Sequence, residues 1–93
     1  MFEIYYNKRV VEKLELIKRD TALFDKYEGF EKGLEENPYC PNLPQIFSAK
    51  SGQYRLVKLS EKVRILYRIW EHDSSVEIYM IEYIENSEES NGV

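Results

Sequence analysis

Arginine and aromatic residues alternate with aliphatic ones through segment 63–70, in a pattern that suits contact with a nucleic acid. Alternate residues of a β-strand share a face, so Arg64, Arg68 and Trp70 would lie on one side of such a strand. Guanidinium groups bind phosphate through two parallel hydrogen bonds, and aromatic rings stack on unpaired bases. If Arg55 lies beside Arg64 on the neighbouring strand, it adds a third arginine to this face. We then expect a surface for single-stranded RNA formed by Arg55, Arg64, Arg68, Trp70, Tyr79 and Tyr83.

The same residues also fit a simpler interpretation, that of an ordinary solvated sheet face. Antiparallel sheets commonly leave one face in water, where arginine–glutamate and tyrosine–arginine pairs across neighbouring strands stabilise the sheet. Glu77 is available to neutralise Arg64 or Arg68. The sequence leaves both interpretations open, and composition alone favours the solvated face.

Other combinations of reactive side chains are weaker. His72 lies in a turn, without a partner that would orient it for catalysis, and no base lies next to the single cysteine, Cys40. One cysteine and one histidine are too few for a typical zinc site. The sequence has neither a phosphate-binding glycine loop nor a Gly-x-Ser-x-Gly turn. We therefore expect no metal and no cofactor.

The composition is that of one small folded domain. The chain has 93 residues, which is the size of a single domain. Hydrophobic residues make up 43% of it, a larger share than a disordered chain contains. The net charge is −4, and segment 84–93, with three glutamates and no basic residue, contributes −3 of it. A balance this acidic argues against a protein that holds nucleic acid mainly by bulk charge. We expect one domain over 1–83 and an acidic, mobile tail over 84–93.

Three features of the sequence favour a cytoplasmic protein with no membrane partner. The single cysteine cannot form an internal disulfide. No apolar run approaches the roughly 18–20 residues that cross a bilayer. The chain does not open on a basic stretch followed by an apolar one, as a secretory leader does.

Hydrophobic periodicity predicts two helices and four strands. Asn7 is a suitable cap for a first helix, whose apolar stripe includes Val10, Leu14 and Ile17. A second helix begins after Asp20-Thr21 and ends at Asn37-Pro38, because the residue before proline avoids the helical region. The segment 38–52 is expected to be a long loop. The predicted strands are Phe2–Tyr5, Tyr54–Leu59, Val63–Trp70 and Val76–Tyr83.

This order, β-α-α-β-β-β, predicts an α+β fold in which a two-helix hairpin packs on one face of a four-stranded, mainly antiparallel sheet. Short connections join the last three strands as hairpins. The face toward the helices is expected to carry Val63, Ile65, Tyr67 and Ile69, with Val76, Ile78 and Met80 from the last strand. The open face is expected to carry Glu77, Tyr79, Ile81 and Tyr83 from that strand.

The element order and several short motifs together resemble the RelE/ParE superfamily of toxins from bacterial and archaeal type II toxin–antitoxin systems. The resemblance covers nearly the whole chain. Its motifs are Asn37-Pro38 at the end of the helical hairpin, Leu43 in the loop, Gly52-Gln53-Tyr54-Arg55-Leu56, and the central strand Lys62-Val63-Arg64-Ile65-Leu66-Tyr67-Arg68-Ile69.

The resemblance implies one of two activities. RelE-like members are endoribonucleases that cut messenger RNA on the ribosome, with basic residues on the open sheet face and a His, Arg or Tyr near the end of the last strand. ParE-like members share the fold and act on DNA gyrase by binding. The positions in this chain that match the ribonuclease set are Arg55, Arg64 and Tyr83, so these are the predicted catalytic residues.

The end of the last strand departs from the ribonuclease pattern. Tyr83 is surrounded by Glu82, Glu85, Glu88 and Glu89, which would repel an RNA backbone. We therefore expect a toxin component, bound by a cognate antitoxin, whose ribosome-dependent mRNA cleavage is weak or absent. The alternative is a non-catalytic binding protein of the same fold, either a gyrase-directed member or an inactive homologue.

Overall fold

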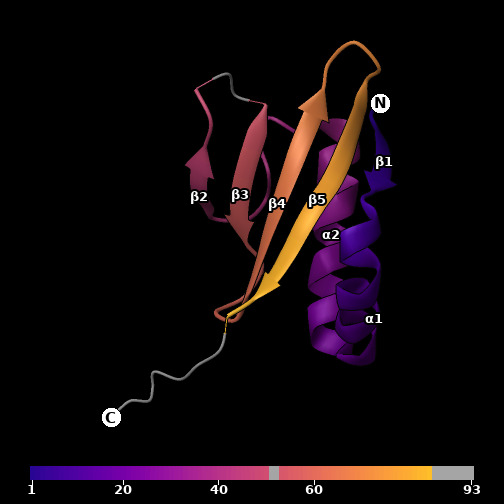
Figure 1. Cartoon of the computed structure of the whole chain (residues 1–93), viewed down its shortest axis with the longest axis vertical. Helices are drawn as coiled ribbons and strands as arrows, with labels where there is room; N and C mark the ends of the chain where they lie inside the picture. The colour runs from indigo at the N-terminus through magenta and orange to yellow at the C-terminus, as the bar shows by residue number, and fades with distance from the viewer. Residues whose placement is uncertain (51–52, 85–93) are drawn as a thin grey trace.

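The computed structural model describes residues 1–50 and 53–84, which form a five-stranded sheet and a pair of helices (Figure 1). The strand order across the sheet is β1-β5-β4-β3-β2. A short 3-10 helix, η1, precedes the first α-helix. The elements are β1 (Glu3–Tyr6), η1 (Lys8–Val10), α1 (Val11–Arg19), α2 (Thr21–Glu36), β2 (Gln45–Ser48), β3 (Tyr54–Lys58), β4 (Val63–Trp70) and β5 (Ser75–Tyr83).

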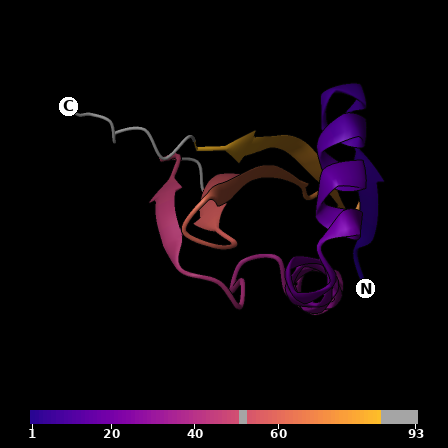
Figure 2. The same ribbon diagram turned by 90° about the horizontal axis from the view of Figure 1, so that it is seen from below.

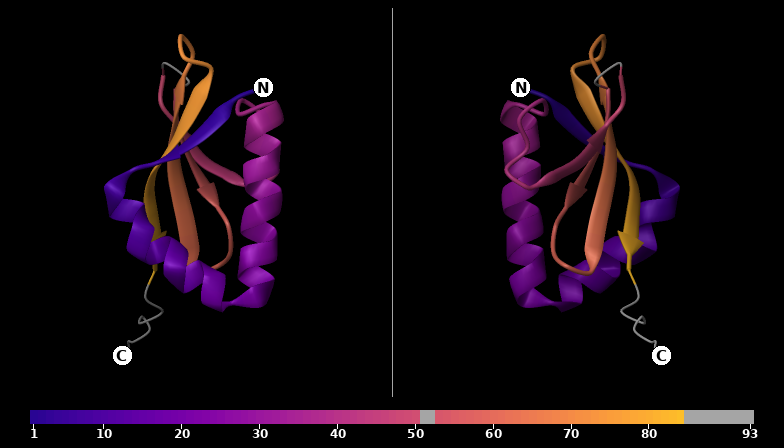
Figure 3. Two further views of the ribbon diagram at one scale, coloured as in Figure 1. Left: turned by 90° about the vertical axis from the view of Figure 1, so that its right-hand side faces the viewer. Right: turned by 90° about the vertical axis from the view of Figure 1, so that its left-hand side faces the viewer.

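The layout confirms the predicted α+β class. Strands β2 to β5 pair antiparallel in sequence order, and β1 pairs with β5 in parallel. Seen from below, the sheet curves, with the helices gathered near the edge formed by β1 and β5 (Figure 2). The views from either side show α2 running along one side of the strands (Figure 3).

The sheet has one strand more than the four predicted. Strand β2 lies inside segment 38–52, which we expected to be a loop, and it pairs with β3 at the edge of the sheet. Only four residues long and preceded by Pro44, it has too little periodicity to be recognised from sequence. All four of its residues are exposed.

The helical segments η1 and α2 begin at residues whose side chains cap them. The Asn7 side chain accepts a hydrogen bond from the Arg9 amide at 3.1 Å and so caps η1. The Asp20 carboxylate accepts one from the Leu23 amide at 3.2 Å and caps α2. Gly33 lets the following loop approach α2, because a Cβ atom there would lie 2.8 Å from the Asn42 side-chain nitrogen.

The core lies between α2 and the sheet. The predicted core residues of β4, namely Val63, Ile65, Tyr67 and Ile69, are all buried. From α2, Phe30 packs edge-on against Tyr67, with ring centroids 5.8 Å apart. The Tyr67 hydroxyl donates a hydrogen bond to the Pro38 carbonyl oxygen at 2.7 Å, which ties the centre of the sheet to the end of α2. Burial raises the pKa of Tyr67, so this hydroxyl stays protonated.

A β-bulge changes which residues of β5 face the core. Met80 is paired with Leu66, but Ile78 is paired with Tyr67, so Tyr79 is an extra residue between them. The alternation of faces is therefore reversed beyond Tyr79. Our assignment of Val76 and Ile78 to the core is confirmed, whereas the assignments of Met80, Ile81 and Tyr83 are wrong. Ile81 and Tyr83 lie on the helix side, and Met80 lies on the open face.

The predicted acidic tail lies almost wholly outside the described residues, which end at Ile84. The amide of Ile84 donates a hydrogen bond to the Lys62 carbonyl oxygen at 2.7 Å. Within the described part of the chain, none of the helices is both long enough and apolar enough to cross a membrane.

The opposite exposure of neighbouring residues on β4 gives a direct test of the two faces. We expect Ile65→Ala to lower the free energy of unfolding by about 2–5 kcal/mol, because Ile65 is fully buried. The matched control is Leu66→Ala on the half-buried open face, which should cost only about 1 kcal/mol. Urea denaturation of both variants measures the difference, and equal losses would contradict the assignment of faces.

Candidate functional site on the open sheet face

The sheet face away from the helices is made of cross-strand rows with different chemistry. Pairing places the residues of each row side by side across neighbouring strands. The first row is basic and acidic, the second apolar, and the third aromatic and charged. The rows are Lys58–Arg64–Glu82, then Phe47–Leu56–Leu66–Met80, then Tyr54–Arg68–Glu77.

Arg68 is the centre of an aromatic cluster in the third row. Its guanidinium carbon lies 3.5 Å from the ring centroid of Trp70 and 5.0 Å from that of Tyr54. One terminal nitrogen donates a hydrogen bond to the Tyr54 hydroxyl oxygen at 3.1 Å, while the buried Nε has no hydrogen-bond partner among the described residues. The Trp70 indole donates to a carboxylate oxygen of Glu77 at 3.2 Å. These contacts hold two aromatic rings and a cation in place.

The bulge residue Tyr79 extends this cluster toward η1. Its ring meets that of Tyr54 edge-on, with centroids 6.1 Å apart, and the guanidinium carbon of Arg9 lies 4.7 Å from its centroid. Stacking platforms for unpaired bases are built from such rings and guanidinium groups. The open face therefore carries a fixed aromatic cluster with stacking capacity at the end of the sheet near β1.

Arg64 is the predicted catalytic residue that the structure places on the open face. It stands on the central strand between Lys58 and Glu82. Lys58 forms an ion pair with Glu61 at 2.8 Å, and the nearby lysine lowers the pKa of that carboxyl. Arg64 has no hydrogen bond or ion pair with residues 1–50 or 53–84, so its planar guanidinium group can bind a phosphate.

Arg55 lies on the other face, contrary to our expectation. It is paired with Tyr67, whose side chain is in the core, and not with Arg64. One terminal nitrogen donates hydrogen bonds to the Tyr39 carbonyl oxygen at 3.1 Å and to the Gln45 side-chain oxygen at 2.9 Å. Arg55 thus connects β3 to the loop and to the edge strand β2.

Tyr83 also lies on the helix side, because it follows the bulge. Its ring lies beside α1, with the Lys13 ammonium nitrogen 5.8 Å from the ring centroid. Partial burial raises the pKa of Tyr83, which makes the phenol a poorer proton acceptor at neutral pH. The structure therefore does not bring Arg55, Arg64 and Tyr83 together on one surface.

The other candidate reactive residues are exposed. His72 lies in the turn between β4 and β5, and Cys40 is a free thiol in the loop after α2. The described residues contain no group of three or more His, Cys, Asp or Glu side chains placed to hold a metal ion.

Comparison with known proteins gives a clear result for the fold. No protein-family model matches the sequence, and a search of curated proteins finds no match either. The structure is similar to the YoeB/ParE toxin from Agrobacterium tumefaciens, with a TM-score of 0.72 over 90% of this chain and 100% of that toxin, at 14% sequence identity. The chain has the fold of the RelE/ParE toxins.

Two further solved structures are similar to this chain. The archaeal RelE–RelB complex from Pyrococcus horikoshii has a TM-score of 0.67 at 17% identity, over 88% of this chain and 93% of that one. A metal-bound toxin from Helicobacter pylori has a TM-score of 0.62 at 19% identity, over 98% of this chain and 100% of that one. The element order predicted from sequence, β-α-α-β-β-β, thus led to the correct fold class.

Sequence reasoning missed two features of the open face of this RelE/ParE fold. Lys58, not Arg55, is the basic residue opposite Arg64. The sequence did indicate that Arg55 faces the core. Alternate residues of a strand share a face, and Arg55 alternates with Val57 and Leu59, both of which are buried. The apolar row was missed because Phe47 lies in the unrecognised strand β2 and Met80 lies just after the bulge.

The aromatic cluster predicts a spectroscopic effect, because Trp70 is the single tryptophan of the chain. We expect Arg68→Ala to shift the Trp70 emission to longer wavelength and to cost about 1–2 kcal/mol, since a partly desolvated cation–π contact is lost. Arg64→Ala is the matched control and should leave the emission unchanged. If both variants give the wild-type spectrum, Arg68 does not cover the indole.

Proposed function

We propose that this protein is the toxin component of a type II toxin–antitoxin system and is held inactive by an antitoxin protein. The observation that carries the proposal is the fold, which is similar along nearly its whole length to three toxin structures. One of these structures is a complex of RelE with RelB, which supports a protein partner for this chain as well. We place the action of the protein in the cytoplasm.

We infer that mRNA cleavage by this protein is weak or absent. Attack of a ribose 2′-hydroxyl on the neighbouring phosphate needs a group that accepts the hydroxyl proton and donors that stabilise the negative charge of the transition state. Arg64 and Lys58 provide donors on the open face. Arg55 and Tyr83 are on the other face, and Glu82 beside Arg64 brings a negative charge toward the phosphate.

The apolar row supports a toxin that acts by binding a protein. The side chains of Leu56, Leu66 and Met80 are half-buried and form a strip across the face, continued by Phe47, which is 55% exposed. Interface cores are enriched in aromatic residues and methionine and poor in charge. A target protein such as DNA gyrase is therefore favoured over a ribosomal A-site RNA, and the basic and aromatic rows would form the rim of such an interface.

The second candidate function is a weak ribosome-dependent endoribonuclease. It is supported by the free guanidinium of Arg64 together with the stacking cluster around Arg68, which suit phosphate and base contacts respectively. In that case Arg64 would be the residue on which cleavage depends most, because its guanidinium group forms no hydrogen bond or ion pair with the described residues.

Induced expression in a bacterial host separates these functions. We expect growth arrest by the wild-type protein, relief of the arrest when a cognate antitoxin is co-expressed, and transcript ends that do not change within minutes of induction. Leu66→Asp should abolish the arrest, because a carboxylate in the apolar strip opposes burial against a protein.

The control for this experiment is Glu36→Gln, an exposed change at the end of α2 that should arrest growth as the wild type does. Rapid cleavage of transcripts on translating ribosomes, lost in Arg64→Ala, would favour the endoribonuclease instead. Normal growth at high levels of folded protein would contradict the toxin proposal itself.

A further inference from the structure

Basic side chains gather around the turn that joins β3 to β4, close to the end of the described chain. Figure 1 shows the end of β5 beside this turn. The Ile84 amide donates a hydrogen bond to the Lys62 carbonyl oxygen at 2.7 Å, and Arg64 is paired with Glu82 across the strands. Lys26 of α2 lines the same hollow as Lys62. We call Lys26, Lys62 and Arg64 the β3–β4 cations.

The described carboxylates neutralise the β3–β4 cations only in part. Glu61, in the turn itself, forms an ion pair with Lys58. Asp20 lines the same hollow, but its carboxylate already caps α2. None of the three cations has an ion pair or a side-chain hydrogen bond with residues 1–50 or 53–84, although Glu82 is the neighbour of Arg64. An anionic segment can therefore approach them.

The sequence that follows Ile84 is acidic. Segment 85–93 carries Glu85, Glu88 and Glu89 and no basic residue. A polypeptide spans up to roughly 3.4 Å per residue, and neighbouring strands lie about 4.8 Å apart. Arg64 is one strand away from the end of β5. All three glutamates are therefore within reach of the β3–β4 cations.

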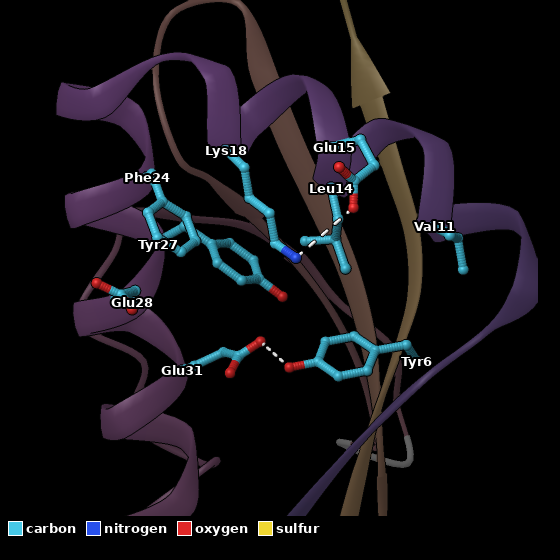
Figure 4. Close-up of a pocket in the computed structure, with 9 residues that line it drawn as sticks. All are labelled: Tyr6, Val11, Leu14, Glu15, Lys18, Phe24, Tyr27, Glu28 and Glu31. Carbon is cyan, nitrogen blue, oxygen red and sulfur yellow. Dashed lines mark hydrogen bonds and ion pairs between the residues drawn. The ribbon is translucent and has the colours of Figure 1, made fainter.

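The helix side of the molecule offers this segment a less favourable charge. A hollow lies there between α1 and α2, and Figure 4 shows Glu15, Glu28 and Glu31 around it together with Lys18. Lys18 is already in an ion pair with Glu15 at 3.6 Å. Three carboxylates against one ammonium group would repel an acidic segment. Charge complementarity thus favours the β3–β4 cations.

We propose that segment 85–93 binds through its glutamates to the β3–β4 cations of the same chain and competes there with anionic ligands of the open face. Each contact is an exposed ion pair and is weak by itself. The segment is tethered beside its site, so its effective concentration is on the order of millimolar, which favours weak contacts. This inference does not depend on the toxin function, because it rests on the charges and on the position of Ile84.

The direct test compares the full-length protein with a variant that carries Glu85→Gln, Glu88→Gln and Glu89→Gln. The NMR signal of the Arg64 side-chain Nε–H group reports on its surroundings. At low salt we expect this signal to differ between the two proteins. Added sodium chloride should move the wild-type signal to that of the variant, because salt screens exposed charges. Identical Arg64 signals at low salt, or changes at Lys13 of α1 in place of Arg64, would overturn the proposal.

A control variant separates contact from the effect of net charge. Glu12→Gln, Glu28→Gln and Glu36→Gln together remove the same charge from exposed positions on the two helices. Since these positions lie outside segment 85–93, the control should keep the wild-type Arg64 signal. If it shifts the signal as much as the segment variant does, the segment acts only through the overall field of the protein. That result would also overturn the proposal.

Competition is measured with a short oligouridylate as the anionic probe. We expect the segment variant to bind it about threefold to tenfold more tightly than the wild type or the control variant, the effect of removing one or two exposed ion pairs that compete with the probe. Adding Arg64→Gln to both the wild type and the segment variant should shrink this difference. Equal affinities of the segment and control variants, or no binding by either, would overturn the competition.

Discussion

The single extra residue in β5 determines what each face of the sheet presents. The pairing of Met80 with Leu66 and of Ile78 with Tyr67 leaves Tyr79 as a bulge. Even-numbered residues therefore face the core before the bulge, and odd-numbered residues face it after the bulge. Val76 and Ile78 reach the core on one side of the bulge. Ile81 does so on the other, whereas an uninterrupted strand would have put it in solvent. A bulge that allows both halves of β5 to bury their aliphatic residues is stabilised by that burial.

The same bulge separates groups that a nuclease would need together. It turns Tyr83 toward α1 and places Met80 in the apolar strip beside Leu66. Tyr79 itself contacts Tyr54 and Arg9, which ties η1 to the aromatic cluster. The open face therefore has cationic, apolar and aromatic rows, but the phenol that would accept or donate a proton lies on the other side of the sheet.

The fold was largely predictable because its strongest signals are local. In β4, alternate aliphatic residues identified the core face correctly, and the caps Asn7 and Asp20 marked the starts of the helical segments.

The register of the strands could not be predicted in this way, since it depends on pairing between strands. The face of Arg55 could have been predicted from its shared alternation with the buried Val57, but its cross-strand partner, Tyr67, could not. The bulge was harder, because Met80 and Ile81 are both apolar and either can face the core. The hydrogen bond from the Tyr6 hydroxyl to Glu31, which joins β1 to α2, depends on how the two elements meet in space, which no spacing in the sequence reveals.

The separation of Tyr83 from Arg64 is the claim on which the functional account depends, and proton–proton contacts in solution test it most directly. In NMR spectra that report nuclear Overhauser effects, the account predicts strong contacts between the Tyr83 ring and the Val63 methyl groups, because Val63 is the cross-strand partner of Tyr83 and is buried on the helix side. Contacts of the Tyr83 ring with the methyl groups of Leu66 and Met80, in place of Val63, would contradict it. Such contacts would show that Tyr83 and Arg64 lie on the same face of the sheet.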